Sequence, residues 1–208
     1  MRNLFVILFS CLLVSVSTAT TAYAQKLPKA VKKTIKANVK QFEKEDWSLE
    51  GTGTFESVLT SHHMALSSEG AMEIVSTATD KQSINLAKAV VRNNAINEYV
   101  EYTRSMVRAR VNTDMADLAN EQRENFVAGY ERLIVKEIDG DIKRSFYLFR
   151  RNKKTNTYDV QGYFIVDEAK AAAASKRALQ NAAKELEIAT SYADKVSEFV
   201  KDGFKDMK

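Results

Sequence analysis

The most constraining pattern in this sequence runs from Lys81 to about Arg110, where apolar residues recur at every third or fourth position. Polar and charged residues fill most of the positions between them, and the recurring apolar ones are Ile84, Ala87, Val91, Ala95, Tyr99, Tyr102, Met106 and Ala109. Such a period predicts one long amphipathic helix with a single buried face. Residues 112–114 (Asn-Thr-Asp) supply N-capping side chains, so we expect a break there and a second helix from Met115 to about Lys136.

Two runs that alternate apolar and polar residues come next and predict a β-hairpin. The runs are Ile142 to Arg150 and Tyr158 to Val166, and the polar segment from Arg151 to Thr157 is the expected loop. Side chains two positions apart lie on the same face of a strand. The expected inward residues are therefore Ile142, Phe146 and Leu148 on the first strand and Val160, Phe164 and Val166 on the second.

Residues 27–45 also have a helical pattern. The apolar stripe is Leu27, Val31, Ile35, Val39 and Phe42, and the other face carries Lys29, Lys32, Lys33, Lys36 and Lys40. We expect the stripe to pack on the domain while the lysines face solvent. The alternative is that this helix lies on an anionic membrane surface.

Two further strands are expected before the long helix, at 49–58 and 72–79. The polar segment 61–70 would connect them, with His62 and His63 as a solvated pair in that loop. Adjacent residues of a strand or helix point in different directions, so two neighbouring histidines rarely bind one metal ion.

The end of the chain is rich in alanine. Asp167 is the expected N-cap of a helix from Glu168 to about Phe199, with a break near Ser191. The apolar residues of this helix keep a near-heptad spacing over too short a length for a free coiled coil. We therefore expect the helix to pack along the sheet.

The order of these elements predicts an α+β fold. We expect a small, mostly antiparallel sheet of about four strands with the long amphipathic helices packed on one face, plus the N-terminal helix. Seven Gly and one Pro in 208 residues are too few for a turn-dense all-β fold. The expected divisions are a signal peptide at 1–24, a basic amphipathic helix at 25–47 and a single α+β domain at 48–208.

The first 24 residues have the features of an export signal. Arg2 gives a positive start, and Leu4 to Val16 is an apolar stretch too short to span a membrane. Ala22 and Ala24 place small side chains where a signal peptidase requires them, so cleavage is expected after Ala24. No other segment approaches the length of about 18 apolar residues that a membrane span needs, so the mature chain is expected to lack one.

Two alternatives to this cleavage stay open. The apolar stretch could remain as an N-terminal anchor, or residues 8–11 (Leu-Phe-Ser-Cys) could act as a lipobox and give a lipoprotein anchored through Cys11. Phe9 is bulky for its place in a lipobox, and an apolar segment follows Cys11 where lipoproteins usually have a polar tether. Cleavage after Ala24 removes Cys11 and leaves a chain without cysteine, which is indifferent to an oxidising compartment.

Few residues of this chain suit catalysis or metal binding. A single cysteine excludes an intramolecular disulfide and a cysteine-rich zinc site. Glu137, Asp139 and Asp141 surround Gly140, but a strand follows where a calcium loop needs its bidentate glutamate, so we expect a capped turn. Neither a nucleophile elbow nor a Walker loop occurs. We predict no catalytic residues, no metal and no cofactor; the alternative is an envelope hydrolase with an unrecognised carboxylate site.

Basic and aromatic residues gather on the expected hairpin. The candidate partner-binding residues are Lys143, Tyr147, Phe149, Arg151, Lys153, Lys154 and Tyr163. The net charge of +4 is a mild excess, and export makes nucleic acid a scarce partner, so no nucleic acid is expected. The expected partner is an envelope component, either a protein or an acidic glycan or lipid. The alternatives are a solvated hairpin tip, or a face covered by the helix at 27–45.

The segment from Met72 to Val166 resembles a known family. A short strand leads into a helix of the form N-L-A-K-A-x-V-x-x-x-A (Asn85 to Ala95), a second helix follows, and the hairpin ends in Y-D-V-Q-G-Y-F-I-V (Tyr158 to Val166). This arrangement resembles the twenty-kilodalton bacterial envelope lipoproteins, the Lpp-twenty-like group. A related fold occurs in the N-terminal domain of a flagellar assembly protein.

The front of the chain, where a lysine-rich helix runs into residues 45–47 (Glu-Asp-Trp), is similar to exported proteins of Gram-negative gut bacteria. The resemblance implies an envelope-associated, non-catalytic binding or assembly module, in the periplasm or at the outer membrane of a Gram-negative bacterium. The family namesakes are lipidated, and this chain lacks a convincing lipobox. The resemblance transfers no functional residues.

Overall fold

The computed structural model describes residues 27–68 and 70–203. The elements in chain order are α1 (Lys29–Lys44), β1 (Ser48–Leu49), α2 (Phe55–Leu66), β2 (Ala71–Lys81), α3 (Ile84–Asp114), α4 (Asn120–Ile138), β3 (Ile142–Asn152), β4 (Thr157–Asp167), α5 (Glu168–Glu185) and α6 (Thr190–Gly203). The export signal predicted at 1–24, with Cys11, lies outside the described residues.

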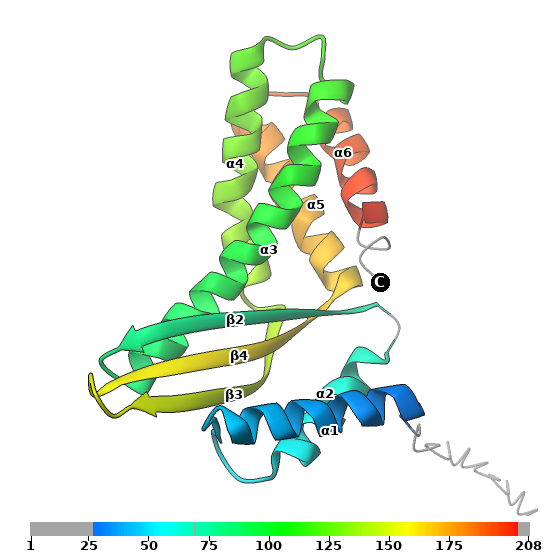
Figure 1. Cartoon of the computed structure of the whole chain (residues 1–208). Coiled ribbons are helices and arrows are strands. Elements are labelled where there is room, and N and C mark those ends of the chain that lie inside the picture. Colours follow the sequence, from blue (N-terminus) through cyan, green and yellow to red (C-terminus); the bar gives the residue numbers. More distant parts are fainter. Residues whose placement is uncertain (1–26, 69, 204–208) are drawn as a thin grey trace, which may run out of the picture.

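The strands form one antiparallel sheet in the order β1-β3-β4-β2. In Figure 1, α1 and α2 lie below this sheet, while α3 to α6 rise from its other side as a helical bundle. The predicted α+β fold is therefore confirmed, with its four-stranded antiparallel sheet, its long helices on one face and its N-terminal helix. The predicted hairpin is confirmed as β3 and β4, joined by the short turn 153–156.

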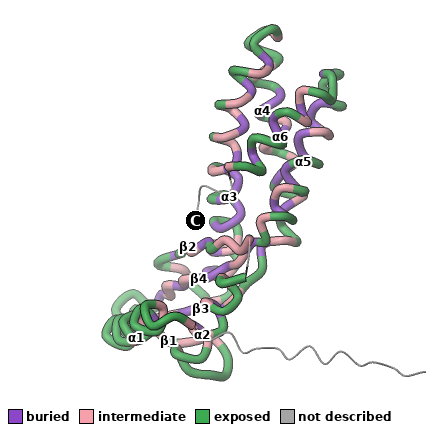
Figure 2. The backbone as a smooth tube through the Cα atoms, turned by 90° about the vertical axis from the view of Figure 1, so that its right-hand side faces the viewer, coloured by how far each residue is buried: buried purple, intermediate pink, exposed green. Residues whose placement is uncertain are grey.

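Helix α3 runs through the main hydrophobic core, and buried segments alternate with exposed ones along each helix of the bundle (Figure 2). Ala87, Val91, Ala95 and Tyr99 are buried as predicted. Beyond Tyr99, Tyr102 and Met106 are partly buried and pack against the core as predicted, but Ala109 is exposed. The fully buried residues there continue in steps of four as Thr103, Val107 and Val111. Thr103 is buried with its hydroxyl satisfied, since that hydroxyl donates to the carbonyl of Tyr99 at 3.1 Å.

The break predicted at 112–114 is also misplaced, because α3 continues to Asp114 and α4 begins at Asn120. The polar side chains at this point interact with their own helix and do not cap the next one. Arg110 Nε lies 2.6 Å from the Asp114 carboxylate, and the Thr113 hydroxyl donates to the Ala109 carbonyl at 3.4 Å.

The alanine-rich C-terminal segment forms two helices, α5 and α6, which confirms a break near Ser191. The Asp167 side chain caps α5 as predicted, accepting from the Lys170 backbone N–H at 3.0 Å. The expectation that this segment packs along the sheet is wrong, because α5 packs mainly between α4 and α6. Small residues permit this close packing: a Cβ placed on Gly129 of α4 would lie 3.4 Å from the Cβ of Ala182 on α5.

A second hydrophobic cluster covers the opposite face of the sheet. Ile35 and Phe42 of α1 and Leu59 of α2 pack there with Leu148 and Tyr163. The apolar stripe of the N-terminal helix therefore packs on the domain, as predicted. The lysines of its other face are exposed, namely Lys29, Lys32, Lys33, Lys36 and Lys40.

The strand predicted at 49–58 is wrong. Only Ser48 and Leu49 pair with β3, and the following residues start helix α2. Thr54 and Ser57 explain the difference, because each side chain accepts the other's backbone N–H, at 3.1 and 3.0 Å. This capping box nucleates a helix where alternation alone indicated a strand. The segment predicted as a loop at 61–70 accordingly continues α2 to Leu66.

The inward face predicted for the first hairpin strand is only partly correct. Ile142 lies in the main core, but Phe146 and Leu148 lie in the second cluster, on the other face of the sheet. A β-bulge between Arg144 and Phe146 shifts the register by one residue, and one extra residue exchanges the two faces of a strand.

We predict that Gly162→Ala lowers the free energy of unfolding by about 3 kcal/mol, because the new methyl group overpacks the core. Its Cβ would lie 2.5 Å from Val91 Cγ1 and 2.7 Å from Tyr147 Cε1. Urea unfolding followed by circular dichroism measures the change. Gly140→Ala is the matched control, since no heavy atom lies within 4 Å of its new Cβ. Equal stability of the two variants would contradict this packing.

Candidate functional site

The residues predicted for the hairpin surface do not form one exposed patch. Tyr147 is 7% exposed and lies in the main core, whereas Tyr163 is 9% exposed and lies in the second cluster. Phe149 packs against the main core as a partly buried residue. These three aromatic side chains, named above as candidate partner-binding residues, therefore do not share one exposed face. The bulge in β3 and the cover of α1 and α2 are the reason.

The basic residues predicted for that surface are exposed. Lys143 lies on β3, Lys153 and Lys154 lie in the hairpin turn, and Arg151 Nε donates to the Asn156 side chain at 3.1 Å. Without the aromatic side chains, these cations lack the apolar component of a typical interface. Their role in binding stays a prediction.

His62 is a buried histidine in α2, and the prediction of a solvated loop position for it is wrong. Its side chain is 1% exposed, and its Nε2 lies 2.5 Å from a carboxylate oxygen of Glu73 on β2. The rings of Phe146 and Tyr163 contact it edge-on, at centroid distances of 5.5 and 5.7 Å. This pair therefore fixes α2 to the sheet.

Burial shifts the pKa values of two side chains near His62, those of His63 and Tyr163. Desolvation, together with the neighbouring His62, lowers the pKa of His63. Desolvation raises the pKa of Tyr163 to about 12. Both shifts disfavour the charged form, as expected for side chains enclosed by apolar neighbours.

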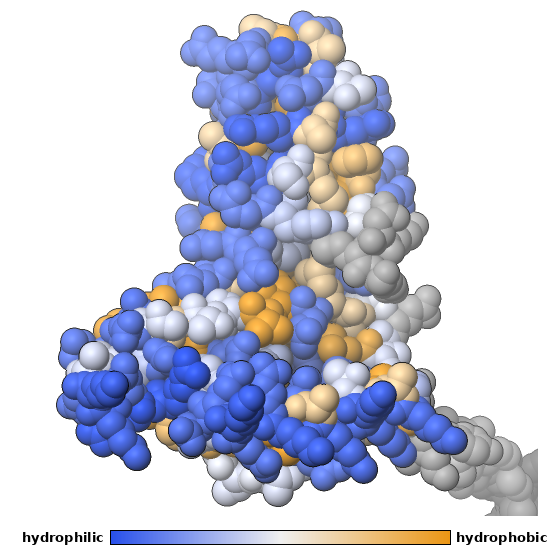
Figure 3. Space-filling model, in the orientation of Figure 1, coloured by the Kyte–Doolittle hydropathy of each residue, from blue (hydrophilic) through white to orange (hydrophobic). Residues whose placement is uncertain are grey.

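A cavity of about 530 Å³ lies beside the start of β2 and has Glu73 in its lining. We call it the β2-edge pocket. Its apolar lining includes Leu66 of α2, Met72 and Ile74 of β2, and the rings of Tyr99 and Tyr102 of α3. Its volume falls within the range of small-ligand and peptide side-chain pockets. In Figure 3, apolar surface is visible between the sheet layer and the rising helices, framed by hydrophilic residues.

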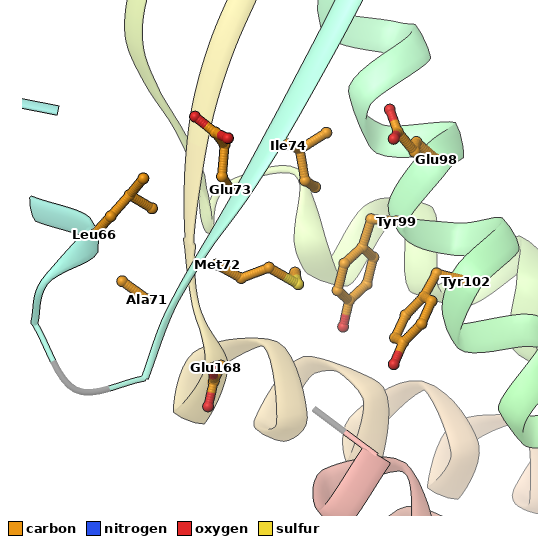
Figure 4. Close-up of a pocket in the computed structure, with 9 residues that line it drawn as sticks. All are labelled: Leu66, Ala71, Met72, Glu73, Ile74, Glu98, Tyr99, Tyr102 and Glu168. Atoms are coloured by element: carbon orange, nitrogen blue, oxygen red, sulfur yellow. The ribbon is translucent and has the colours of Figure 1, made fainter. Parts of the chain in front are cut away.

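The charged side chains that line the β2-edge pocket, among the described residues, are Glu73, Glu98 and Glu168. Figure 4 shows their carboxylates at three separate sides of the pocket, and they do not point toward one another. Partial burial raises the pKa of Glu98 through desolvation. The lining therefore combines an apolar floor with three separated carboxyl groups.

The pocket wall is held by buried hydrogen bonds. The Tyr99 hydroxyl donates to the Ala171 carbonyl of α5 at 3.2 Å and lies 3.0 Å from the Ser175 hydroxyl. Tyr130 of α4 reaches the same Ser175 hydroxyl at 3.4 Å. These contacts tie α3, α4 and α5 together behind the pocket and fix the position of the Tyr99 ring.

Sequence reasoning missed this site. Glu98 lies on the polar face of a helix and Glu73 on an alternating strand, so neither differs from ordinary surface residues in sequence. The order of the strands places β2 at an edge, and strand order is not encoded locally. The Ser61 to Gly70 segment gave no signal either, because its helical start lies upstream at Thr54.

Within 27–68 and 70–203, no group of three or more Cys, His, Asp or Glu side chains is arranged to hold a metal ion. The helices of the same residues include none with the length and hydropathy needed to cross a membrane.

Comparison of the chain with family models, with curated proteins and with solved structures finds no match. The resemblance to envelope lipoproteins in the segment from Met72 to Val166 therefore stays a prediction.

We predict that Glu73→Ala lowers the free energy of unfolding by about 1 to 3 kcal/mol, because it leaves the buried His62 ring without its partner. His62 Nδ1 already lacks a hydrogen-bond partner among the described residues, so the ring would then have none. Chemical denaturation measures the loss. Glu73→Gln keeps an acceptor oxygen and should lose less. Glu43→Ala, on the exposed side of α1, is the control; a loss as large as that of Glu73→Ala would refute the assignment.

Proposed function

We propose that this chain is an exported envelope protein that binds a partner in the β2-edge pocket and performs no catalysis. The observation that carries the binding role is the pocket itself, where an apolar floor and separated carboxylates meet beside an edge strand. The export signal at 1–24 supports the location, in the periplasm or at the outer membrane of a Gram-negative bacterium.

The arrangement of the carboxylates supports binding over hydrolysis. Hydrolysis by a pair of carboxyl groups, as in glycoside hydrolases, needs the two groups on either side of one reacting bond, with their pKa values separated. Glu98 has a raised pKa, which is the observation that favours a hydrolase. However, Glu73 contacts His62, and Glu168 lies at the far end of the pocket from Glu98 (Figure 4). Separated charges of this kind suit recognition of a cationic partner.

We predict that protein recovered from the cell envelope begins at Gln25 and contains 184 residues (208 − 24). Intact mass spectrometry checks this directly. Ala22→Leu should block processing, because a large side chain does not fit the peptidase site, while Tyr23→Leu at the intervening position should not. A product that starts at a lipidated Cys11 would establish the lipoprotein alternative, and an unprocessed chain in the envelope would establish the N-terminal anchor. Absence of the protein from the envelope would end the export proposal.

A second prediction concerns the binding surface. A photo-reactive residue in place of Leu66, in the pocket wall, should give one crosslinked product of defined mass in intact cells, because a bound partner would lie against that wall. The same residue in place of Lys153, in the hairpin turn, is the matched control and should give none. Crosslinking from position 153 and not from position 66 would show that the partner binds at the hairpin and not in the β2-edge pocket.

A further inference from the structure

Strand β2 is at one end of the sheet, so one side of its backbone faces away from β4. Two hydrogen bonds identify which residues face β4 and which face outward. The Glu168 N–H donates to the Gly70 carbonyl at 2.7 Å, and these two residues continue the register that pairs β2 with β4. The backbone of Gly70, and of the even-numbered residues after it, therefore faces β4. The Thr77 carbonyl instead accepts from the Asn94 side chain of α3 at 3.2 Å. Backbone groups alternate along an antiparallel strand, so the odd-numbered residues of β2 direct their N–H and C=O outward.

The outward backbone groups at the centre of this edge have no partner among residues 27–68 and 70–203. Ala71 N–H is bound locally to the Ser68 carbonyl at 3.3 Å, and the Thr77 carbonyl is bound to Asn94. Glu73 and Val75, between them, make no outward backbone hydrogen bond within this part of the chain. An open edge of this kind is a template for another strand.

The β2-edge pocket lies along the same stretch, from Ala71 to Ile74. Side chains of an added strand that point toward α3 would enter the apolar floor at Met72 and Tyr102. The carboxyl group beside them on α3 is that of Glu98, so a positively charged segment is favoured over a negatively charged one.

We propose that an extended, basic segment of a partner protein adds to β2 as a fifth strand. Its backbone pairs with Glu73 and Val75, its apolar side chains fill the β2-edge pocket, and a lysine or arginine side chain contacts Glu98. This inference rests on the proposed binding function and adds the chemistry of the partner.

A second copy of this chain fits the edge less well. Pairing of two β2 strands would bring the glutamates of one pocket against those of the other, and opposed like charges across an interface are unfavourable. A monomer in solution is therefore expected, and light scattering tests it. A dimer whose formation slows amide exchange at Glu73 and Val75 would overturn the proposal in favour of self-association.

The probe is an array of short peptides, about eight residues long, that alternate lysine with valine, leucine or phenylalanine. An identical array with glutamate in place of lysine is the control. Binding to the lysine array alone is expected. Equal binding to both arrays, or binding to neither, would overturn the proposal of a basic partner.

Amide hydrogen exchange then distinguishes strand addition from side-chain contact alone. With the best peptide bound, exchange at Glu73 and Val75 should slow by about tenfold or more, because both amides gain partners. Ile74 and Ser76 already face β4 and should change little. Binding without protection of Glu73 and Val75 would refute strand addition. Protection of these amides in the free monomer would show that another segment of the same chain occupies the edge.

Two sets of variants complete the test. Glu98→Lys should weaken peptide binding by about tenfold, whereas Glu101→Lys, an exposed residue on the same helix, should leave it unchanged. N-methylation of every second peptide residue should abolish binding when the methylated N–H groups face β2. It should be tolerated when they face away from β2. Equal binding of the two N-methylated peptides would exclude strand addition.

These results are separable from the proposed function. Crosslinking from the Leu66 position without protection of Glu73 and Val75 would leave the binding function in place and end the strand-addition model. Absence of the protein from the cell envelope would end the export proposal whatever the peptides do.

Discussion

Helix α3 takes part in two layers of the structure at once. Its first half packs on β2 and β4, where Val91 meets the Cα of Gly162 so closely that no side chain fits between them. Its second half packs against α4 and α6 in the bundle above the sheet. Because one continuous helix carries both contacts, the bundle and the sheet have fixed positions relative to each other. The β2-edge pocket lies at the point where α3 leaves the sheet, and its shape depends on this packing.

Buried polar contacts support that junction. The hydroxyls of Tyr99, Tyr130 and Ser175 meet in the core of the bundle, and burial raises the pKa of Tyr130 to about 12. Hydrogen bonds of this kind fix one arrangement of helices that alanine packing alone would leave less specific. On the other side of the sheet, the His62–Glu73 pair holds α2 against β2. Glu73 thus contacts α2 through His62 and also lines the β2-edge pocket.

The two edges of the sheet differ in how they are protected. Two residues of β1 cover part of the outer edge of β3, and the Glu50 N–H donates to the Tyr147 carbonyl beyond them. The outer edge of β2 has the Asn94 side chain at Thr77 and a cavity beside its first residues. Charged residues flank that open section, as is common where proteins limit unwanted strand pairing. The same charges would select a partner of opposite sign.

The sequence by itself determined the α+β class, the antiparallel hairpin, the buried stripe of the N-terminal helix and the first half of the α3 core face, because these follow from local periodicity. The capping box of Thr54 and Ser57 is also local, but the alternation of residues 49–58 indicated a strand there and not the start of α2. The sequence also contains the apolar and small-residue pattern at 1–24 that predicts export. Tertiary structure decided the rest. A one-residue bulge exchanged the faces of β3, and the strand order left β2 at an edge. The candidate site depends on those non-local facts, since Glu73, Glu98 and Glu168 meet at one pocket only after α3 has packed across the sheet.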